Sequence, residues 1–213
     1  MDDFFAARID KYEEYMLNNV GSCKEGYIEM ARLLPQGVTT LLDLGCGTGL
    51  ELDEIFKKNP DVVVTGIDLT QVMLDKLKEK HADKNIRLIC ANYFDYEFEK
   101  ETFDAAISFQ TMHHFSHEDK MKLYSRINKA LKVGGQYIEC DYMIADQTEE
   151  DFHFVENKRI RREQGIGENE FYHYDTPCTI ENQIKLLLHA GFDDVRKVWR
   201  KENTTIIIAD KKN

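Results

Sequence analysis

The chain has 213 residues, of which 42% are hydrophobic, and this length and composition suit one compact domain spanning residues 1–213. Its 39 Asp and Glu residues outnumber its 28 Lys and Arg residues, and the net charge of −11 disfavours nucleic acid as a substrate. Since no run reaches the roughly 18 apolar residues of a membrane span, and the chain does not open on a basic segment followed by an apolar run, we expect a cytoplasmic protein with no membrane partner.

Residues 1–35 predict two amphipathic helices outside the core of the fold. The first has an apolar face made of Phe5, Ile9, Tyr12 and Met16. The second has an apolar face made of Tyr27, Met30 and Leu34. Ser22 and Glu25 have the spacing of a capping box at the start of the second helix. We expect these two helices to form a lid over a site.

Short apolar runs alternate with helical patterns from residue 40 onward. The runs cover residues 41–44, 62–68, 86–91, 103–109 and 137–142. Gly134 and Gly135 are expected to stop the last of the intervening helices. This order of elements predicts a Rossmann-like α/β fold, with a mostly parallel sheet that is covered by helices on both faces and whose strands are buried on both sides.

Two segments depart from this alternation. Residues 144–175 are an insertion after the fifth strand, expected to contact the substrate. The insertion carries a helix-like apolar face of Phe152, Val155 and Ile160 and then the aromatic residues Phe171, Tyr172 and Tyr174. Residues 195–199 and 204–209 are strand-like runs joined by a short polar link, which predicts a C-terminal hairpin that adds an antiparallel strand and brings the sheet to seven strands.

The stretch LLDLGCGTG at residues 41–49 is a buried strand that runs into a glycine-rich turn and then a helix. Gly45, Gly47 and Gly49 allow a tight turn and close approach of a ligand to the backbone. A dinucleotide fingerprint would require a third glycine where this chain has Leu50, so pyrophosphate recognition and a nicotinamide dehydrogenase are disfavoured. Asp68 ends the second strand, where a carboxylate can accept hydrogen bonds from both hydroxyls of a ribose.

The ends of the third and fourth strands supply further candidates. Asn92 offers an amide that could contact an adenine edge, and the ring of Tyr93 could pack against the base. Phe109 and Gln110 end the fourth strand at the same edge of the sheet, where open α/β sheets bind their ligands.

These motifs, from about residue 41 to residue 211, resemble those of the class I S-adenosylmethionine-dependent methyltransferases. The resemblance implies S-adenosyl-L-methionine as the cofactor and methyl transfer to a small-molecule acceptor. LDLGCGTG is similar to the motif near the methionine end of that cofactor, and GIDLTQVML at residues 66–74 is similar to the ribose-binding acidic motif. The cofactor-binding residues implied by the motifs are Asp43, Gly45, Cys46, Gly47, Gly49, Asp68, Leu69, Met73, Asn92, Tyr93, Phe109 and Gln110.

A further resemblance, to the carboxy-S-adenosylmethionine synthases, lies in Gly26 and Tyr27, and it adds Tyr27 to the cofactor-binding candidates. Those enzymes place an arginine in the helix before the terminal hairpin, whereas this chain offers Leu186 in the corresponding stretch IKLLLHAGF. The departure favours ordinary methyl transfer. A carboxy-S-adenosylmethionine synthase-like transferase and a non-catalytic S-adenosylmethionine-binding regulatory protein remain alternatives, and the chain could be a monomer or a homodimer.

Methyl transfer needs a general base only when the attacking atom carries a proton. The candidates near the strand ends are His113, His114, Asp141, Tyr142, His153 and His173, of which we rank His114 and Tyr142 first. The alternative interpretation of the paired histidines is structural.

Three other features have plain interpretations. No paired carboxylate and no second cysteine near the histidines supports a metal site, so none is expected. Cys46 is interpreted as a small residue packed against the cofactor, and the five scattered cysteines as reduced thiols. The basic run at residues 158–162 is interpreted as a solvated helix face, with attraction of an acidic acceptor as the alternative.

Overall fold

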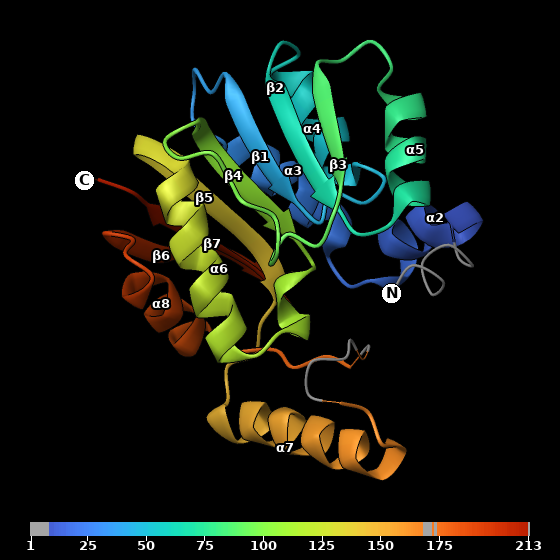
Figure 1. The fold of residues 1–213 in the computed structure, drawn as a ribbon, viewed down its shortest axis with the longest axis vertical. Coiled ribbons are helices and arrows are strands. Elements are labelled where there is room, and N and C mark those ends of the chain that lie inside the picture. The colour runs from blue at the N-terminus through green and yellow to red at the C-terminus, as the bar shows by residue number, and fades with distance from the viewer. Residues whose placement is uncertain (1–8, 168–171, 173, 213) are drawn as a thin grey trace.

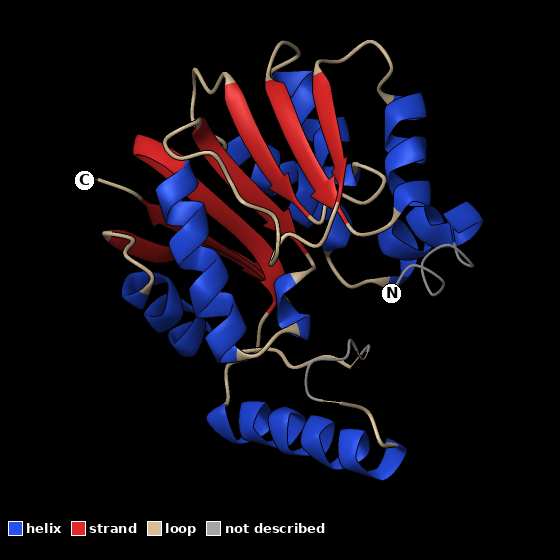
Figure 2. Cartoon of the chain, viewed as in Figure 1, coloured by secondary structure: helices blue, strands red, loops and turns tan. Residues whose placement is uncertain are grey.

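The computed structural model describes residues 9–167, 172 and 174–212, so the predictions for Phe5, Phe171 and His173 lie outside the described residues. Seven strands form one sheet in the order β3-β2-β1-β4-β5-β7-β6 (Figures 1 and 2). The strands are β1 (Thr40–Leu44), β2 (Val63–Asp68), β3 (Ile86–Cys90), β4 (Phe103–Phe109), β5 (Leu131–Tyr142), β6 (Asp194–Lys201) and β7 (Thr204–Asp210). The first five run parallel, β7 runs antiparallel to β5, and β6 pairs with β7 as a hairpin, which confirms the expected fold.

Helices cover both faces of the sheet, and side-chain alternation in the strands divides the core between the two faces. The helices are α2 (Ile9–Asn19), α3 (Cys23–Leu33), α4 (Leu50–Lys58), α5 (Gln71–Lys80), α6 (His117–Ala130), α7 (Gln147–Gln164) and α8 (Ile180–His189), with a short 3₁₀ helix η1 (Met112–His114). Leu41 of β1 packs with α3 and α4, whereas its neighbour Leu42 packs with α6 and α8. Asp43 therefore lies on the α3/α4 face.

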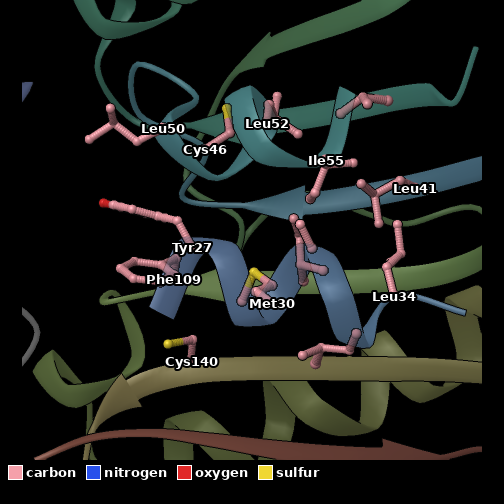
Figure 3. Packing of buried hydrophobic residues seen from close by; sticks show 14 of the residues in the cluster. Tyr27, Met30, Leu34, Leu41, Cys46, Leu50, Leu52, Ile55, Phe109 and Cys140 are labelled. Atoms are coloured by element: carbon pink, nitrogen blue, oxygen red, sulfur yellow. The ribbon is translucent and has the colours of Figure 1, made fainter. Parts of the chain in front are cut away.

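On the α3/α4 face, the second N-terminal helix, α3, packs against the sheet as part of the hydrophobic core (Figure 3). Tyr27, Met30 and Leu34 of α3 and its C-terminal flank are buried, as their spacing predicts. The ring of Tyr27 stacks on that of Phe109 with centroids 3.9 Å apart. Each fully buried large apolar side chain of this kind contributes about 1.5–3 kcal/mol to stability, so α3 is part of the folded core rather than a loose appendage.

Three predictions about local structure are wrong. Ser22 does not form a capping box, because its backbone is left-handed (φ 60°) and its hydroxyl donates to Glu202 instead of accepting from the helix. Gly134 and Gly135 do not stop a helix, since α6 ends at Ala130 and both glycines lie inside β5, beside a register shift against β4. Strand β3 is not buried on both sides, because it forms the edge of the sheet.

The insertion also differs from its predicted packing. Helix α7 forms and extends away from the sheet (Figure 1). Phe152 and Val155 are 59% and 60% exposed, so these two apolar positions do not face a core. In its basic run, Arg159 forms ion pairs with Glu156 and Glu163 on the same helix. Within the ranges 9–167 and 174–212, no helix is long and apolar enough to cross a membrane.

Candidate active site

The glycine-rich turn joins β1 to α4 at the carboxyl edge of the sheet. Backbone N–H groups of Gly45 and Cys46 donate to the carbonyl of Ile67 at 2.8 and 3.3 Å, which fixes the turn against β2. Gly45 has a φ of +73°, and a Cβ there would lie 2.9 Å from the Thr111 hydroxyl. Only glycine therefore suits this position, and the turn packs closely against the end of β4.

Asp68 holds the same turn from the end of β2. Its carboxylate accepts hydrogen bonds from the backbone N–H groups of Gly47 (2.9 Å) and Thr70 (2.8 Å). The group is partly buried, and Met73 is buried on the first turn of α5, while Leu69 is partly exposed. Asp68 thus connects the turn with the segment that would receive a ribose.

A pair of buried carboxyl groups, Asp43 and Glu51, lies beside the turn. Both side chains are at least 95% buried, and Asp43 Oδ2 and Glu51 Oε1 have no hydrogen-bond donor among the described residues. Burial raises the pKa of both carboxyl groups, that of Glu51 to about 7, and the neighbouring Glu51 raises the pKa of Asp43 further. A proton on one carboxyl group would let the two groups hydrogen-bond to each other, and a cationic ligand group would also compensate their charge.

The charge of this pair suits S-adenosylmethionine. The cofactor carries a sulfonium and an α-ammonium at its methionine end, and ionised carboxylates attract both cations. Asp68, which also acts on the pKa of Asp43, adds a third negative charge to this group. The residues present therefore suit a cationic cofactor at the end of β1.

Helix α2 reaches the glycine-rich turn through Tyr12. Tyr12 of α2 is directed at the turn, since its hydroxyl lies 3.8 Å from where a Cβ on Gly47 would be. Burial and then Glu51 and Asp68 raise the pKa of Tyr12, which places its phenol beside the same carboxylates. Sequence reasoning assigned neither Tyr12 nor Glu51 to the site, because only the packing of α2 and α4 brings them to the turn.

Salt bridges hold α2 in that position. The ammonium of Lys80 on α5 lies 3.1 Å from both Glu13 of α2 and Asp53 of α4. Lys76 donates to the carbonyl of Ile9 at 3.1 Å. The first described helix is thus fastened to two elements that flank the turn.

The candidate residues at the ends of β3 and β4 already form hydrogen bonds with other residues of the protein. Asn92 is exposed and occupied in its own turn, where its carbonyl accepts from the N–H of Phe94 and its amide donates to Asp95. Tyr93 is buried, with its hydroxyl 2.8 Å from that of Thr111. The Gln110 amide donates to Thr204 at 3.4 Å.

The histidines that follow β4 converge on the end of β5. The buried carboxylate of Asp141 accepts from the N–H groups of Met112 and Tyr142, each at 2.7 Å, and pairs with Nδ1 of His113. Although burial disfavours the charged imidazole, Asp141 raises the pKa of His113. The rings of His114 and Tyr142 lie 4.0 and 6.0 Å from that of His113. The structure therefore brings both first-ranked catalytic candidates around a third residue, His113.

Two groups of described residues have the composition of metal ligands. One is His113, His114 and Asp175, and the other is His117, Glu150 and Cys178. In the second group, the buried ammonium of Lys120 already lies 3.1 Å from the Cys178 sulfur. A cation in that position opposes the binding of a second cation.

Known proteins share sequence with this chain. Residues 41–135 match a family model described as a methyltransferase domain. The chain is 29% identical to a carboxy-S-adenosyl-L-methionine synthase of Trichodesmium erythraeum, with 87% of this chain and 78% of the relative aligned. It is 25% identical to the synthase of the same description from Helicobacter pylori, with 99% and 90% aligned.

Solved structures share the fold. A putative O-methyltransferase from Nostoc punctiforme superposes with a TM-score of 0.69 at 18% identity over 88% of this chain and 56% of that chain. Human N-acetylserotonin methyltransferase in complex with S-adenosylmethionine superposes with a TM-score of 0.65 at 19% identity over 90% of this chain and 53% of that chain. This chain thus spans little more than half the length of either protein.

Proposed function

Because the chain belongs to the class I S-adenosylmethionine-dependent methyltransferases, we propose that it transfers the methyl group of S-adenosylmethionine to a small-molecule acceptor. The observation that carries this proposal is the buried acidic pair of Asp43 and Glu51 beside the glycine turn. Such a pair is costly to bury unless a proton or a cationic ligand compensates it. A cofactor with two cationic groups provides that compensation.

In this proposal each element has a defined task. The turn at Gly45 to Gly49 and the carboxylate of Asp68 bind the cofactor, and Asp43 and Glu51 orient its methionine end. When bound, the cofactor supplies an electrophilic methyl group on its sulfonium. Stacked Tyr27 and Phe109 keep water from that end. The remaining cofactor-contacting side chains are Cys46, Leu69, Met73, Asn92, Tyr93 and Gln110.

The acceptor is proposed to lie between the turn and η1. His114 and Tyr142 flank this region, and either can take the proton of an attacking hydroxyl or thiol. Residues of the 144–175 insertion complete the acceptor side, since Asp175 lies 3.3 Å from Nδ1 of His114. Positioning of the two reactants supplies most of the acceleration in such a transfer.

A second candidate is a carboxy-S-adenosylmethionine synthase-like reaction, which the names of the aligned relatives favour. Two features of this chain oppose it. Leu186, which stands where the synthases are expected to have an arginine, packs against the core cluster of the α6/α8 face. The acidic group of Asp43, Glu51 and Asp68 would also repel the extra carboxylate of a carboxylated sulfonium.

Calorimetry with three ligands separates these functions. We expect saturable binding of S-adenosylmethionine and S-adenosylhomocysteine, and weaker binding of carboxy-S-adenosylmethionine. Tighter binding of the carboxylated compound, or its release from the purified protein on denaturation as seen by mass spectrometry, would favour the second candidate. If neither S-adenosylmethionine nor its demethylated product binds, the proposal fails.

A labelled-methyl assay against a panel of hydroxyl, thiol and amine acceptors tests the transfer itself. We expect label in at least one acceptor class. Tight cofactor binding without transfer to any acceptor would favour the regulatory alternative over an enzyme.

A further inference from the structure

Two imidazoles and one carboxylate converge where η1 meets the segment that precedes α8. Asp175 Oδ1 lies 3.6 Å from His113 Nε2 and 3.3 Å from His114 Nδ1, and the three donor atoms all lie within 4.8 Å of one another. Both distances are longer than a good N–H···O hydrogen bond, which measures about 2.7–3.2 Å. They match the roughly 3.4 Å that separates two ligands bound at about 2.1 Å to one tetrahedral ion.

The backbone holds this set in place from both sides. Thr176 donates its N–H (2.7 Å) and its hydroxyl (3.1 Å) to the carbonyl of His113, which fixes Asp175 next to the histidine pair. Asp141 binds Nδ1 of His113 and is itself held by the N–H groups of Met112 and Tyr142. A histidine ligand commonly has a carboxylate of this kind on its second nitrogen, which orients the ring and leaves the first nitrogen for a metal.

From this geometry we propose that His113, His114 and Asp175 bind a divalent transition-metal ion, with Asp141 as the carboxylate that orients His113. Two imidazoles and one carboxylate suit Zn²⁺, Fe²⁺ or Co²⁺ rather than Mg²⁺ or Ca²⁺, which prefer oxygen ligands. The proposal departs from the expectation of no metal site. That expectation came from spacing along the sequence, which cannot place Asp175 beside His113 and His114.

The role of the ion rests on the proposed function. Three protein ligands leave at least one coordination position open, as catalytic sites require. With the ion bound, His114 is a ligand and not a base, and a hydroxyl or thiol acceptor at the open position loses its proton to solvent more readily. Its oxygen or sulfur then forms a bond to the methyl carbon with its own electron pair, and the carbon–sulfur bond of the sulfonium breaks onto sulfur. The metal therefore assigns the acceptor to compounds whose attacking group is a hydroxyl or a thiol.

Cobalt(II) titration of tag-free protein stripped with a chelator tests the site directly. We expect saturable visible d–d absorption with about one ion per chain, displacement by Zn²⁺, and no sulfur-to-cobalt charge-transfer band. His113→Ala, His114→Ala and Asp175→Asn should each abolish the absorption. Asp141→Asn should weaken binding by about 10- to 100-fold, the usual effect of losing the carboxylate behind a ligating histidine.

His117→Ala is the matched control, because His117 lies in the neighbouring cluster with Cys178 and should leave the cobalt spectrum unchanged. A charge-transfer band that Cys178→Ser removes would place the ion in that other cluster and overturn the proposal. Wild-type protein with native circular dichroism and no d–d absorption would also overturn it.

Calorimetry with S-adenosylhomocysteine on the same stripped protein distinguishes a failure of the metal proposal from a failure of the proposed function. Binding of that ligand without cobalt absorption refutes only the metal. Cobalt absorption without ligand binding refutes only the proposed function.

Discussion

Glu51 illustrates how burial sets the charge of a single residue at the proposed cofactor site. Burial raises its pKa to about 7, so the carboxyl group changes charge near neutral pH. We predict that affinity for S-adenosylmethionine rises between pH 6 and pH 8, since only the ionised pair attracts the two cations of the ligand. Calorimetry across this range measures the effect, and Glu51→Gln should show weaker binding with a flatter pH dependence. Equal slopes in the two proteins would contradict the assignment.

The raised pKa of Glu51 has the opposite effect on the stability of the unliganded protein, which it should lower as the pH rises. A carboxyl group whose pKa is raised on folding favours the folded state below its ordinary pKa of 4.5, and this contribution is lost as the pH rises through 7. The unliganded protein with Glu51→Gln should therefore lose less stability between pH 5 and pH 8 than the wild type. Thermal melts without ligand provide this comparison.

Asp68 combines a structural role with its proposed binding role. Asp68→Ala should weaken cofactor binding by about 1–3 kcal/mol, because it removes charge-assisted hydrogen bonds to a ribose and frees the N–H groups of Gly47 and Thr70. Asp68→Asn keeps one carbonyl acceptor and should lose less. Calorimetry with S-adenosylhomocysteine reports both values, and an unchanged affinity in the alanine variant would refute the ribose assignment.

The candidate site residues that the sequence could suggest are those that belong to continuous motifs. The glycines of the turn and Asp68 could be named because each lies at a fixed place in a strand–turn–helix unit. Glu51, Tyr12 and Asp175 could not be assigned, since their roles depend on which elements pack beside the turn and η1. Asn92 was a reasonable candidate by position, but an asparagine after a strand also closes its own turn, as this one does.

At the level of elements, the contact between the turn and β2 depends on Gly66. A Cβ at this position would lie 2.8 Å from the sulfur of Cys46. Gly66→Ala should therefore destabilise the protein by about 1–3 kcal/mol through overpacking, and it should weaken cofactor binding because the turn must shift. Chemical denaturation and calorimetry measure the two effects.

A second substitution separates this clash from a general loss of strand stability. In a Cys46→Ala background the sulfur is absent, so the cost of Gly66→Ala should fall by more than half. Additive effects of the two substitutions would show that they do not interact and would refute the packing argument.

The elements were easiest to predict where local pattern and burial agree. The central strands are continuous apolar runs, and the hairpin of β6 and β7 is two such runs with a polar link. The edge position of β3 was not evident, because an apolar run does not reveal where a strand lies in the sheet. Gly134 and Gly135 follow a helical pattern, and the same residues can end a helix or allow an irregularity in a strand. In this chain both glycines lie in an irregular part of strand β5.

On the scale of the whole molecule, the order of elements predicted a mostly parallel sheet with a C-terminal antiparallel strand, since alternating strands and helices permit few right-handed arrangements. Helix α7 is the exception. Its apolar residues at helical spacing suggested a buried face, but the helix extends from the body of the protein with Phe152 exposed (Figure 1). Amphipathic spacing indicates that a face can be buried, and tertiary contacts alone decide whether the same chain covers it.

The net charge of −11 gives the molecule a negative field that should act on cofactor association. S-adenosylmethionine carries a net charge of about +1 at neutral pH, whereas S-adenosylhomocysteine is a zwitterion without net charge. Raising the ionic strength from about 0.01 M to about 0.15 M shortens the screening length from about 30 Å to about 8 Å. We predict that the association rate constant of S-adenosylmethionine falls several-fold over this range, while that of S-adenosylhomocysteine changes little. Stopped-flow measurements of protein fluorescence can follow both ligands, with Trp199 as the chain's tryptophan.

Since the carboxylates of Asp43, Glu51 and Asp68 dominate the field at the site itself, Glu51→Gln should reduce the salt dependence for the charged ligand. Equal salt dependence for the two ligands would show that the field of the protein does not select the cationic cofactor.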